Sequence, residues 1–250
     1  METPPLRRLK RQQSQKNSAQ STNFKSDFRP KLLVEEAPLT EELLHRKVAV
    51  ATIRGRPYYN ITSALKLMEM QFDSLSPEEA ASSSAKVIIT TRDEAIIVNR
   101  KGAVMLDTEL AKYPAIAKAK ILKSIIGDRA DDQLTIGIDP GSRIGISAIY
   151  LHQEISSAVE STPEDAVDQV SAMLGGIESH KKVVKIGDGD ISMARQIARM
   201  IKMKFHSNVS VEIVDEHGTS QNADANRRGA RDRSSARTIA FRSGRSFTLR

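Results

Sequence analysis

The chain has 250 residues, of which 39% are hydrophobic, and it carries a formal charge of +7 and no cysteine. This length allows one large domain or two smaller ones with a real core, and no stretch reaches the roughly 20 apolar residues that a membrane-spanning helix needs. The lack of cysteine excludes disulfides, zinc fingers and thiol catalysis, so a bound metal must use oxygen or histidine ligands. We therefore expect a soluble protein, with the cytoplasm as its default location, whose positive charge favours nucleic acid over a membrane as its partner.

The N-terminal segment, residues 1–31, is rich in basic residues set among Gln, Ser and Asn, and it offers almost nothing to bury. Such a composition predicts a disordered basic tail. The tail would either grip nucleic acid weakly or keep the protein in solution.

Residues 38–127 predict a small, separate α+β accessory domain. The expected elements are a helix over Leu39–Arg46, a hairpin of VAVATI and YYNI, helical spacing over Ile61–Met70, a helix capped by Ser76 with Pro77 in its first turn, short strands VIITT and AIIV, and a helix over Pro114–Ile126 stopped by Gly127. This order leaves two interpretations open, a winged-helix-like nucleic-acid module or a plain scaffold. The short polar segment 128–133 marks the domain boundary.

Residues 134–250 predict a second domain with a clear order of elements. Three strands come first, LTIGID, IGISAIYL and HQEISSAV, and tight turns make neighbouring strands antiparallel. A helix starting at Thr162 follows, then the strand VVKIG, a helix marked by Met193 and Ile197, the strand VSVEIV and a last helix over Asp232–Arg242. The expected order is three strands, helix, strand, helix, strand, helix.

Acidic residues stand at the edges of these elements, where active sites usually form. They are Asp139, Asp188, the pair Asp215 and Glu216, and Asp232. Structural roles compete with the functional ones: Asp139 can stabilise its turn, Asp190 is a better helix N-cap than Asp188, and Asp232 can cap its own helix. Hard carboxylate oxygens that converge on one point favour Mg²⁺ or Mn²⁺.

The C-terminal segment 227–250 holds eight arginines against the single acid Asp232. A planar guanidinium suits bidentate phosphate contacts better than a merely solvated tail requires. We assign nucleic-acid contacts to Ser142, Arg227, Arg228, Arg231 and Arg237.

The motif GIDPGSRIGIS and the order of elements resemble the RuvC-type Holliday junction resolvases and their YqgF relatives, members of the ribonuclease H-like superfamily, over residues 134 to about 244. VDEHGTS resembles the YqgF fifth-strand motif, which reads Asp-Glu-Arg. The chain departs from the pattern in three places. His217 replaces the YqgF arginine, the fourth strand ends in Gly-Asp-Gly-Asp where RuvC proteins usually place a glutamate, and residues 38–127 have no counterpart.

The resemblance implies a ribonuclease H-like mixed five-stranded sheet with flanking helices and a metal-dependent endonuclease. Its catalytic residues would be Asp139, Asp188, Glu216 and Asp232, with Mg²⁺ or Mn²⁺ held by Asp139, Asp188 and Asp232. The implied substrate is branched DNA such as a Holliday junction, in DNA recombination and repair, and the resolvases cut as homodimers.

Two other functions stay open at this stage. The chain could be a non-catalytic nucleic-acid-binding protein with the same fold, which the fourth-strand departure and the ambiguity between Asp215 and Glu216 favour, whereas the presence of Asp139, Asp188 and Asp232 together favours catalysis. An actin-like or sugar-kinase-like ATPase is more remote, because such proteins need two halves that each open with a strand hairpin. The sequence leaves the choice between DNA and RNA undecided.

Overall fold

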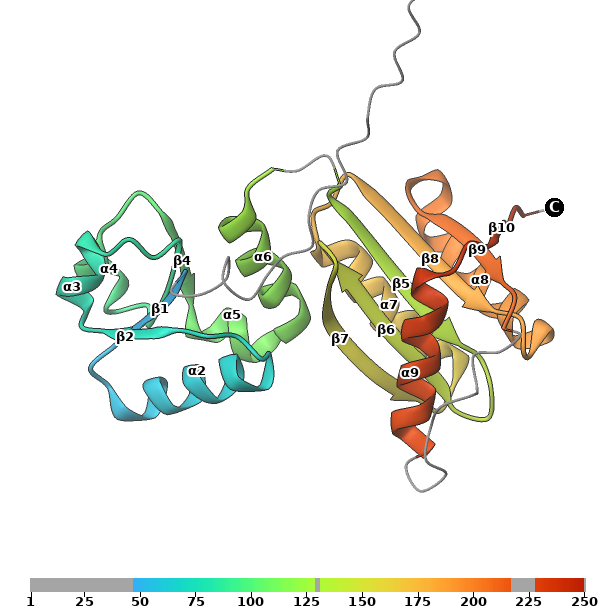
Figure 1. Cartoon of the computed structure of the whole chain (residues 1–250), viewed down its shortest axis with the longest axis horizontal. Helices are drawn as coiled ribbons and strands as arrows, with labels where there is room; N and C mark the ends of the chain where they lie inside the picture. Colours follow the sequence, from blue (N-terminus) through green and yellow to red (C-terminus); the bar gives the residue numbers. More distant parts are fainter. Residues whose placement is uncertain (1–46, 129–130, 217–227, 250) are drawn as a thin grey trace, which may run out of the picture. The chain divides into compact units, whose positions relative to one another are not determined.

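The computed structural model describes residues 47–128, 131–216 and 228–249. Every helix within these ranges is too short or too polar to span a bilayer. Three expectations fall outside them: the basic tail over residues 1–31, the helix over Leu39–Arg46, and any role of His217 or Arg227. The described residues form two β-sheets flanked by helices (Figure 1).

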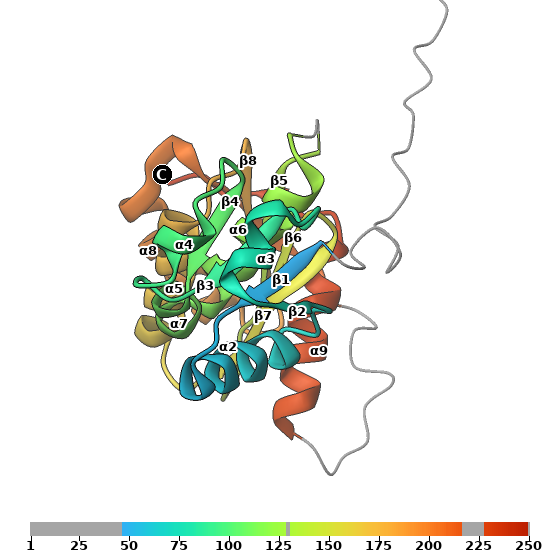
Figure 2. The same ribbon diagram turned by 90° about the vertical axis from the view of Figure 1, so that its left-hand side faces the viewer.

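The first sheet has four strands in the order β2-β1-β3-β4, and all of its pairs are parallel. The elements of this part are β1 (Val48–Ala51), α2 (Gly55–Leu67), β2 (Asp73–Leu75), α3 (Pro77–Ser82), β3 (Val87–Thr90), α4 (Ala95–Val98), β4 (Ala103–Leu106), α5 (Asp107–Lys112) and α6 (Pro114–Ile126). The central strands β1 and β3 are fully buried, as the apolar runs VAVA and VIIT require in a parallel sheet covered on both faces. Helices α2 and α5 pack on one face and α3 and α4 on the other (Figure 2).

The expected hairpin is wrong, because YYNI lies in α2 and β1 pairs with β2 and β3. Helical spacing of the buried Ile61 and Leu65 outweighs the β-propensity of the two tyrosines. The expected strand AIIV is also wrong, since α4 buries Val98 and leaves Ile96 82% exposed. An all-parallel sheet has no hairpin wing, so this part is α/β and the winged-helix interpretation is wrong. Ser76 does cap α3, in a complete capping box.

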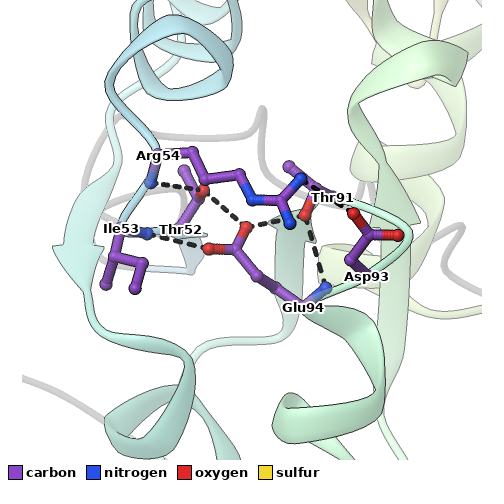
Figure 3. Close-up of polar contacts among 6 residues, drawn as sticks. All are labelled: Thr52, Ile53, Arg54, Thr91, Asp93 and Glu94. Atoms are coloured by element: carbon purple, nitrogen blue, oxygen red, sulfur yellow. Dashed lines mark hydrogen bonds and ion pairs between the residues drawn. The ribbon is translucent and has the colours of Figure 1, made fainter.

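A buried carboxylate ties together the exits of the two central strands (Figure 3). Glu94, which is 4% exposed, accepts hydrogen bonds from the hydroxyl groups of Thr52 at 2.5 Å and Thr91 at 2.6 Å and from the amide of Ile53 at 3.0 Å. Burial alone would raise the pKa of Glu94, but these hydrogen bonds and the charge of Arg54 outweigh it and lower the pKa. The carboxylate therefore stays ionised, and its hydrogen bonds hold the carboxyl ends of β1 and β3 together.

The second sheet has six strands in the order β10-β9-β8-β5-β6-β7. The elements are β5 (Gln133–Asp139), β6 (Ile144–Tyr150), β7 (Gln153–Glu160), α7 (Pro163–Gly176), β8 (Lys181–Gly187), α8 (Ile191–Phe205), the 3-10 turn η1 (His206–Asn208), β9 (Ser210–Val214), α9 (Arg228–Phe241) and β10 (Arg245–Ser246). Strands β5, β6 and β7 are antiparallel neighbours, whereas β5, β8 and β9 run parallel.

The expected order of elements is confirmed, and the strand order and directions are compatible with a ribonuclease H-like fold. The expected count of five strands is not, because the two-residue strand β10 adds an antiparallel edge to β9. Two residues are too short to leave a periodic pattern in the sequence.

Strand alternation divides the second sheet into two faces. Leu134, Ile136 and Ile138 of β5 enter a core formed with α7 and α8. The alternate residues of β5 face α9, which crosses the opposite face of the sheet (Figure 1). Asp139, the last residue of β5, belongs to this second set.

Helix α9 lies very close to the sheet because two strand residues lack a side chain. A Cβ added to Gly137 would overlap the carbonyl oxygen of Ala236, and one added to Gly145 would overlap that of Asp232. Backbone thus meets backbone across this interface. The contact fixes the distance of α9 from the sheet and its position along the sheet. The position of Asp232 relative to β5 is thereby fixed as well.

Candidate active site

Asp139 is the centre of a group of acidic side chains at the carboxyl end of β5. It is half-buried and shares a hydrogen bond with the side chain of Ser235 on α9. Burial, together with the negative charges of Glu216 and Asp232, raises its pKa to about 7, against the opposing effects of the Ser235 hydrogen bond and the charge of Arg231. Asp139 is therefore only partly ionised near neutral pH, and a bound cation would favour its ionised form.

Asp232 reaches the same place from α9. The helix begins at Arg228, four residues earlier than the sequence pattern indicates, so Asp232 lies inside the helix and does not cap it. Its side chain is 22% exposed, and its Oδ2 atom lies 3.6 Å from Nε of Arg143. Among the described residues this buried oxygen receives no hydrogen bond. A buried carboxylate oxygen with one distant cation is costly, and a further positive charge would relieve that cost.

Glu216 follows β9 and lies over the end of β8. Its carboxylate occupies the space that a side chain at Gly187 or Gly189 would fill, and the Gly189 amide donates a hydrogen bond to it. Burial raises the pKa of Glu216 and the charge of Asp188 raises it further, while the Gly189 amide and Arg242 lower it. Of the two neighbouring acids, Glu216 is thus the one turned inward, since Asp215 is exposed.

Asp188 is placed differently from the other three acids. Its Oδ1 accepts a hydrogen bond from the backbone amide of Glu216 at 3.0 Å. Gly187 faces Glu216, so strand alternation turns the next side chain toward α8, and Asp188 is not among the charges that act on Asp139. Asp190 caps α8, as expected, by accepting from the Met193 amide.

The structure brings only part of the predicted basic set to the site. Arg231 is exposed and near enough for its charge to act on Asp139. Arg237 pairs with Glu154 at 3.4 Å. Ser142 is exposed in the turn after β5. Arg227 and the side chain of Arg228 lie outside the described part of the chain.

Three residues at the site were missed by sequence reasoning. Arg143 follows the GIDPGS turn and pairs with Asp232, and Ser235 lies one helical turn beyond that aspartate. Arg242 donates to the backbone carbonyl of Asp215 at 2.9 Å. The signal for Ser235 was the spacing of three residues on a helix, which places it on the same face as Asp232.

The carboxylate oxygens of the acidic group suit a hard divalent cation, although the acidic side chains are not tightly clustered. Within residues 47–128, 131–216 and 228–249, no three His or acidic side chains are grouped so that they could hold a metal ion. Mg²⁺ is usually bound by one or two carboxylates, with waters and substrate phosphate oxygens as its other ligands. Pairs that include Asp139 therefore fit such an ion.

No protein-family model matches the chain, and no curated protein matches it. Among solved structures the chain is similar to the MID-PIWI domains of N. crassa QDE-2 AGO, with 12% identity, a TM-score of 0.28, and coverage of 78% of this chain and 80% of that one. It is also similar to Aa-Ago with externally bound siRNA, at 10% identity and a TM-score of 0.25 over 69% of this chain and 35% of that chain. A. aeolicus Argonaute is similar at 9% identity and a TM-score of 0.20, over 71% of this chain and 35% of that chain. At these identities and TM-scores the likeness carries no argument about family or function.

Proposed function

We propose that this protein is a metal-dependent endonuclease that hydrolyses phosphodiester bonds in structured nucleic acid. The observation that carries the proposal is the meeting of Asp139, Glu216 and Asp232, which come from β5, the end of β9 and α9. Burial, with the negative charges of the other two acids, raises the pKa of Asp139 to about 7. Like charges held this close are costly unless a cation neutralises them. Such a site suits a substrate that brings phosphate oxygens to the same cation.

The cation would be Mg²⁺ or Mn²⁺, held by Asp139 with Asp232 or Glu216. Two such ions bound there would activate a water and stabilise the leaving oxygen of a phosphodiester. Asp188, which sequence reasoning places among the ligands, would support the site through the backbone of Glu216, since its Oδ1 holds that amide. Arg143 would keep Asp232 oriented until the metal binds.

The substrate class rests on charge and on the RuvC-like sequence motif. Arg231 stands beside the carboxylates, and the segment that contains it is strongly basic. Phosphate contacts of this kind position a substrate without reading its sequence. Specificity would then come from shape, so branched DNA of the Holliday junction type is the proposed substrate, cut by a homodimer that offers one site to each strand.

The test is Mg²⁺- or Mn²⁺-dependent cleavage of four-way, forked, duplex and single-stranded DNA and RNA. Wild type is compared with Asp139→Asn and with a control, Asp168→Asn, whose side chain is 75% exposed on α7. Loss of cleavage in Asp139→Asn alone, with binding retained, supports the proposal and identifies the substrate. A wild type that binds these substrates and cleaves none of them overturns it.

The second candidate function is a non-catalytic nucleic-acid-binding protein. One observation favours it: no three metal-binding side chains are grouped in the part of the chain that the structure describes. In that case Asp139 would be only partly ionised at neutral pH and would serve to hold Ser235. The ATPase alternative gains nothing, because the strands described in the first sheet are all parallel and form no opening hairpin.

A further inference from the structure

A cleft of about 750 Å³ lies beside the candidate active site. Helix α8 forms one wall, residues 243–249 with the short strand β10 form the other, and Ile213 of β9 lies between them. Asp188 lines the cleft and also holds the amide of Glu216. Asp215, which precedes Glu216, also lines the cleft, so the cleft borders the acidic group at the ends of β8 and β9.

Three arginines line this cleft from both walls. Arg195 and Arg199 are exposed and one helical turn apart on α8, and Arg245 comes from β10. In the described ranges none of the three takes part in an ion pair shorter than 4.0 Å, although the cleft also contains Asp188 and Asp215. Cations on facing walls without acidic partners suit a chain of phosphates.

The same cleft offers apolar surface between the charges. Ile191 is 45% exposed at the start of α8 and Leu249 is 51% exposed, and Phe247, which is half-buried against the hydrophobic core, also lines the cleft. The Phe247 amide donates to the carbonyl of Val211 at 2.8 Å, which fixes this residue against the edge of the sheet. Proteins that bind single-stranded nucleic acid combine a positively charged groove with aromatic rings on which bases stack.

We infer that this cleft binds a single-stranded segment of the substrate next to the bond that is cut. Arg195, Arg199 and Arg245 would contact its phosphates, and Phe247 would stack on an unpaired base. Only an unstacked base offers its face to a protein ring, so the cleft selects single strands, such as those beside a branch, over continuous duplex. The inference rests on the proposed nuclease function for the position of the cut, but binding can be tested without cleavage.

The test measures the affinity of a fluorescein-labelled single-stranded DNA by fluorescence anisotropy at several salt concentrations. All proteins carry Asp139→Asn, so that no cleavage occurs. In the variant Arg195→Ala/Arg199→Ala we expect weaker binding and a shallower salt dependence, with the slope of log K against log salt reduced by about 0.7 for each phosphate that the variant no longer neutralises. The control is Arg56→Ala/Arg92→Ala, which removes the same charge from exposed residues that do not line the cleft.

A second variant, Phe247→Leu, separates stacking from charge. It keeps an apolar side chain against the sheet, and we expect roughly tenfold weaker binding with an unchanged salt slope, since the substitution removes stacking and leaves every phosphate contact in place. The same affinity and slope for the Arg195/Arg199 variant and its control would overturn the inference, as would binding of duplex without binding of single strands. Cleavage by a protein with an intact Asp139 decides the nuclease proposal separately.

Discussion

Gly145→Ala tests whether α9 is held against the sheet by backbone contact. The added Cβ would overlap the carbonyl group of Asp232 and would come within 3.4 Å of the Cβ of Ala236. A helix backbone cannot turn aside as a flexible side chain can, so α9 must move. Overpacking of this kind costs about 1–3 kcal/mol, and we expect the upper half of that range because the contact is with backbone.

The assay is urea denaturation of the metal-free protein followed by far-UV circular dichroism. With a denaturant slope of about 2 kcal/mol/M, a loss of about 2 kcal/mol lowers the midpoint by about 1 M. The control is Gly175→Ala in α7, where an added Cβ meets no atom within 4 Å. Alanine is the better helix former there and should stabilise the protein by about 0.5–1 kcal/mol. Equal midpoints for the two variants would refute the close contact of α9 with β6.

Three further predictions concern individual side chains. Glu94→Gln should lower the free energy of unfolding by about 1–3 kcal/mol at pH 7, because one of the buried hydrogen bonds to the carboxylate loses its acceptor. Its control, Asp93→Asn, removes only the exposed partner of an ion pair (Figure 3) and should lower the free energy of unfolding by less than about 1 kcal/mol. Folding lowers the pKa of Glu94, so the ionised carboxylate stabilises the protein above its unfolded pKa, and this stabilisation disappears on acidification. The difference in urea midpoint between wild type and Glu94→Gln should therefore become smaller at low pH. Folding raises the pKa of Asp139 from 3.8 to about 7, so the metal-free wild type should gain stability relative to Asp139→Asn as the pH falls from about 8 toward about 5. Parallel curves of urea midpoint against pH for the two proteins would contradict the raised pKa. Ser76→Ala should lower the thermal midpoint through a loss of about 1 kcal/mol, since it removes a helix cap, and an unchanged midpoint would show that the cap contributes nothing.

The second sheet could be predicted from the sequence because its local signals agree with one another. Alternating apolar residues define β5 and β6, and Thr162 and Asp190 cap the helices that follow in the order expected. The first sheet was harder, since β-branched and aromatic residues in YYNI and AIIV form helices once tertiary packing selects one face. Propensity alone cannot decide such short segments.

The candidate site was predictable in its residues and less so in their grouping. The motif identified Asp139 and the acids that join it, but which of Asp188 and Glu216 faces it depends on the direction of each side chain at the end of a strand. That direction changes with a shift of one residue. Arg195 and Arg199 escaped notice because charges on the exposed face of a helix usually contact only water.

Helix α9 combines two surfaces that can change independently. Its inner face is fixed by carbonyl groups resting on the bare backbone of Gly137 and Gly145, so the carboxylate of Asp232 is set by main-chain geometry and not by the size of neighbouring side chains. Its outer face bears exposed arginines that no packing constrains, such as Arg231 and Arg233. If the proposed function holds, substitutions there would alter which nucleic acid is preferred while the acidic centre keeps its place, which makes this helix the natural starting point for redesigning specificity.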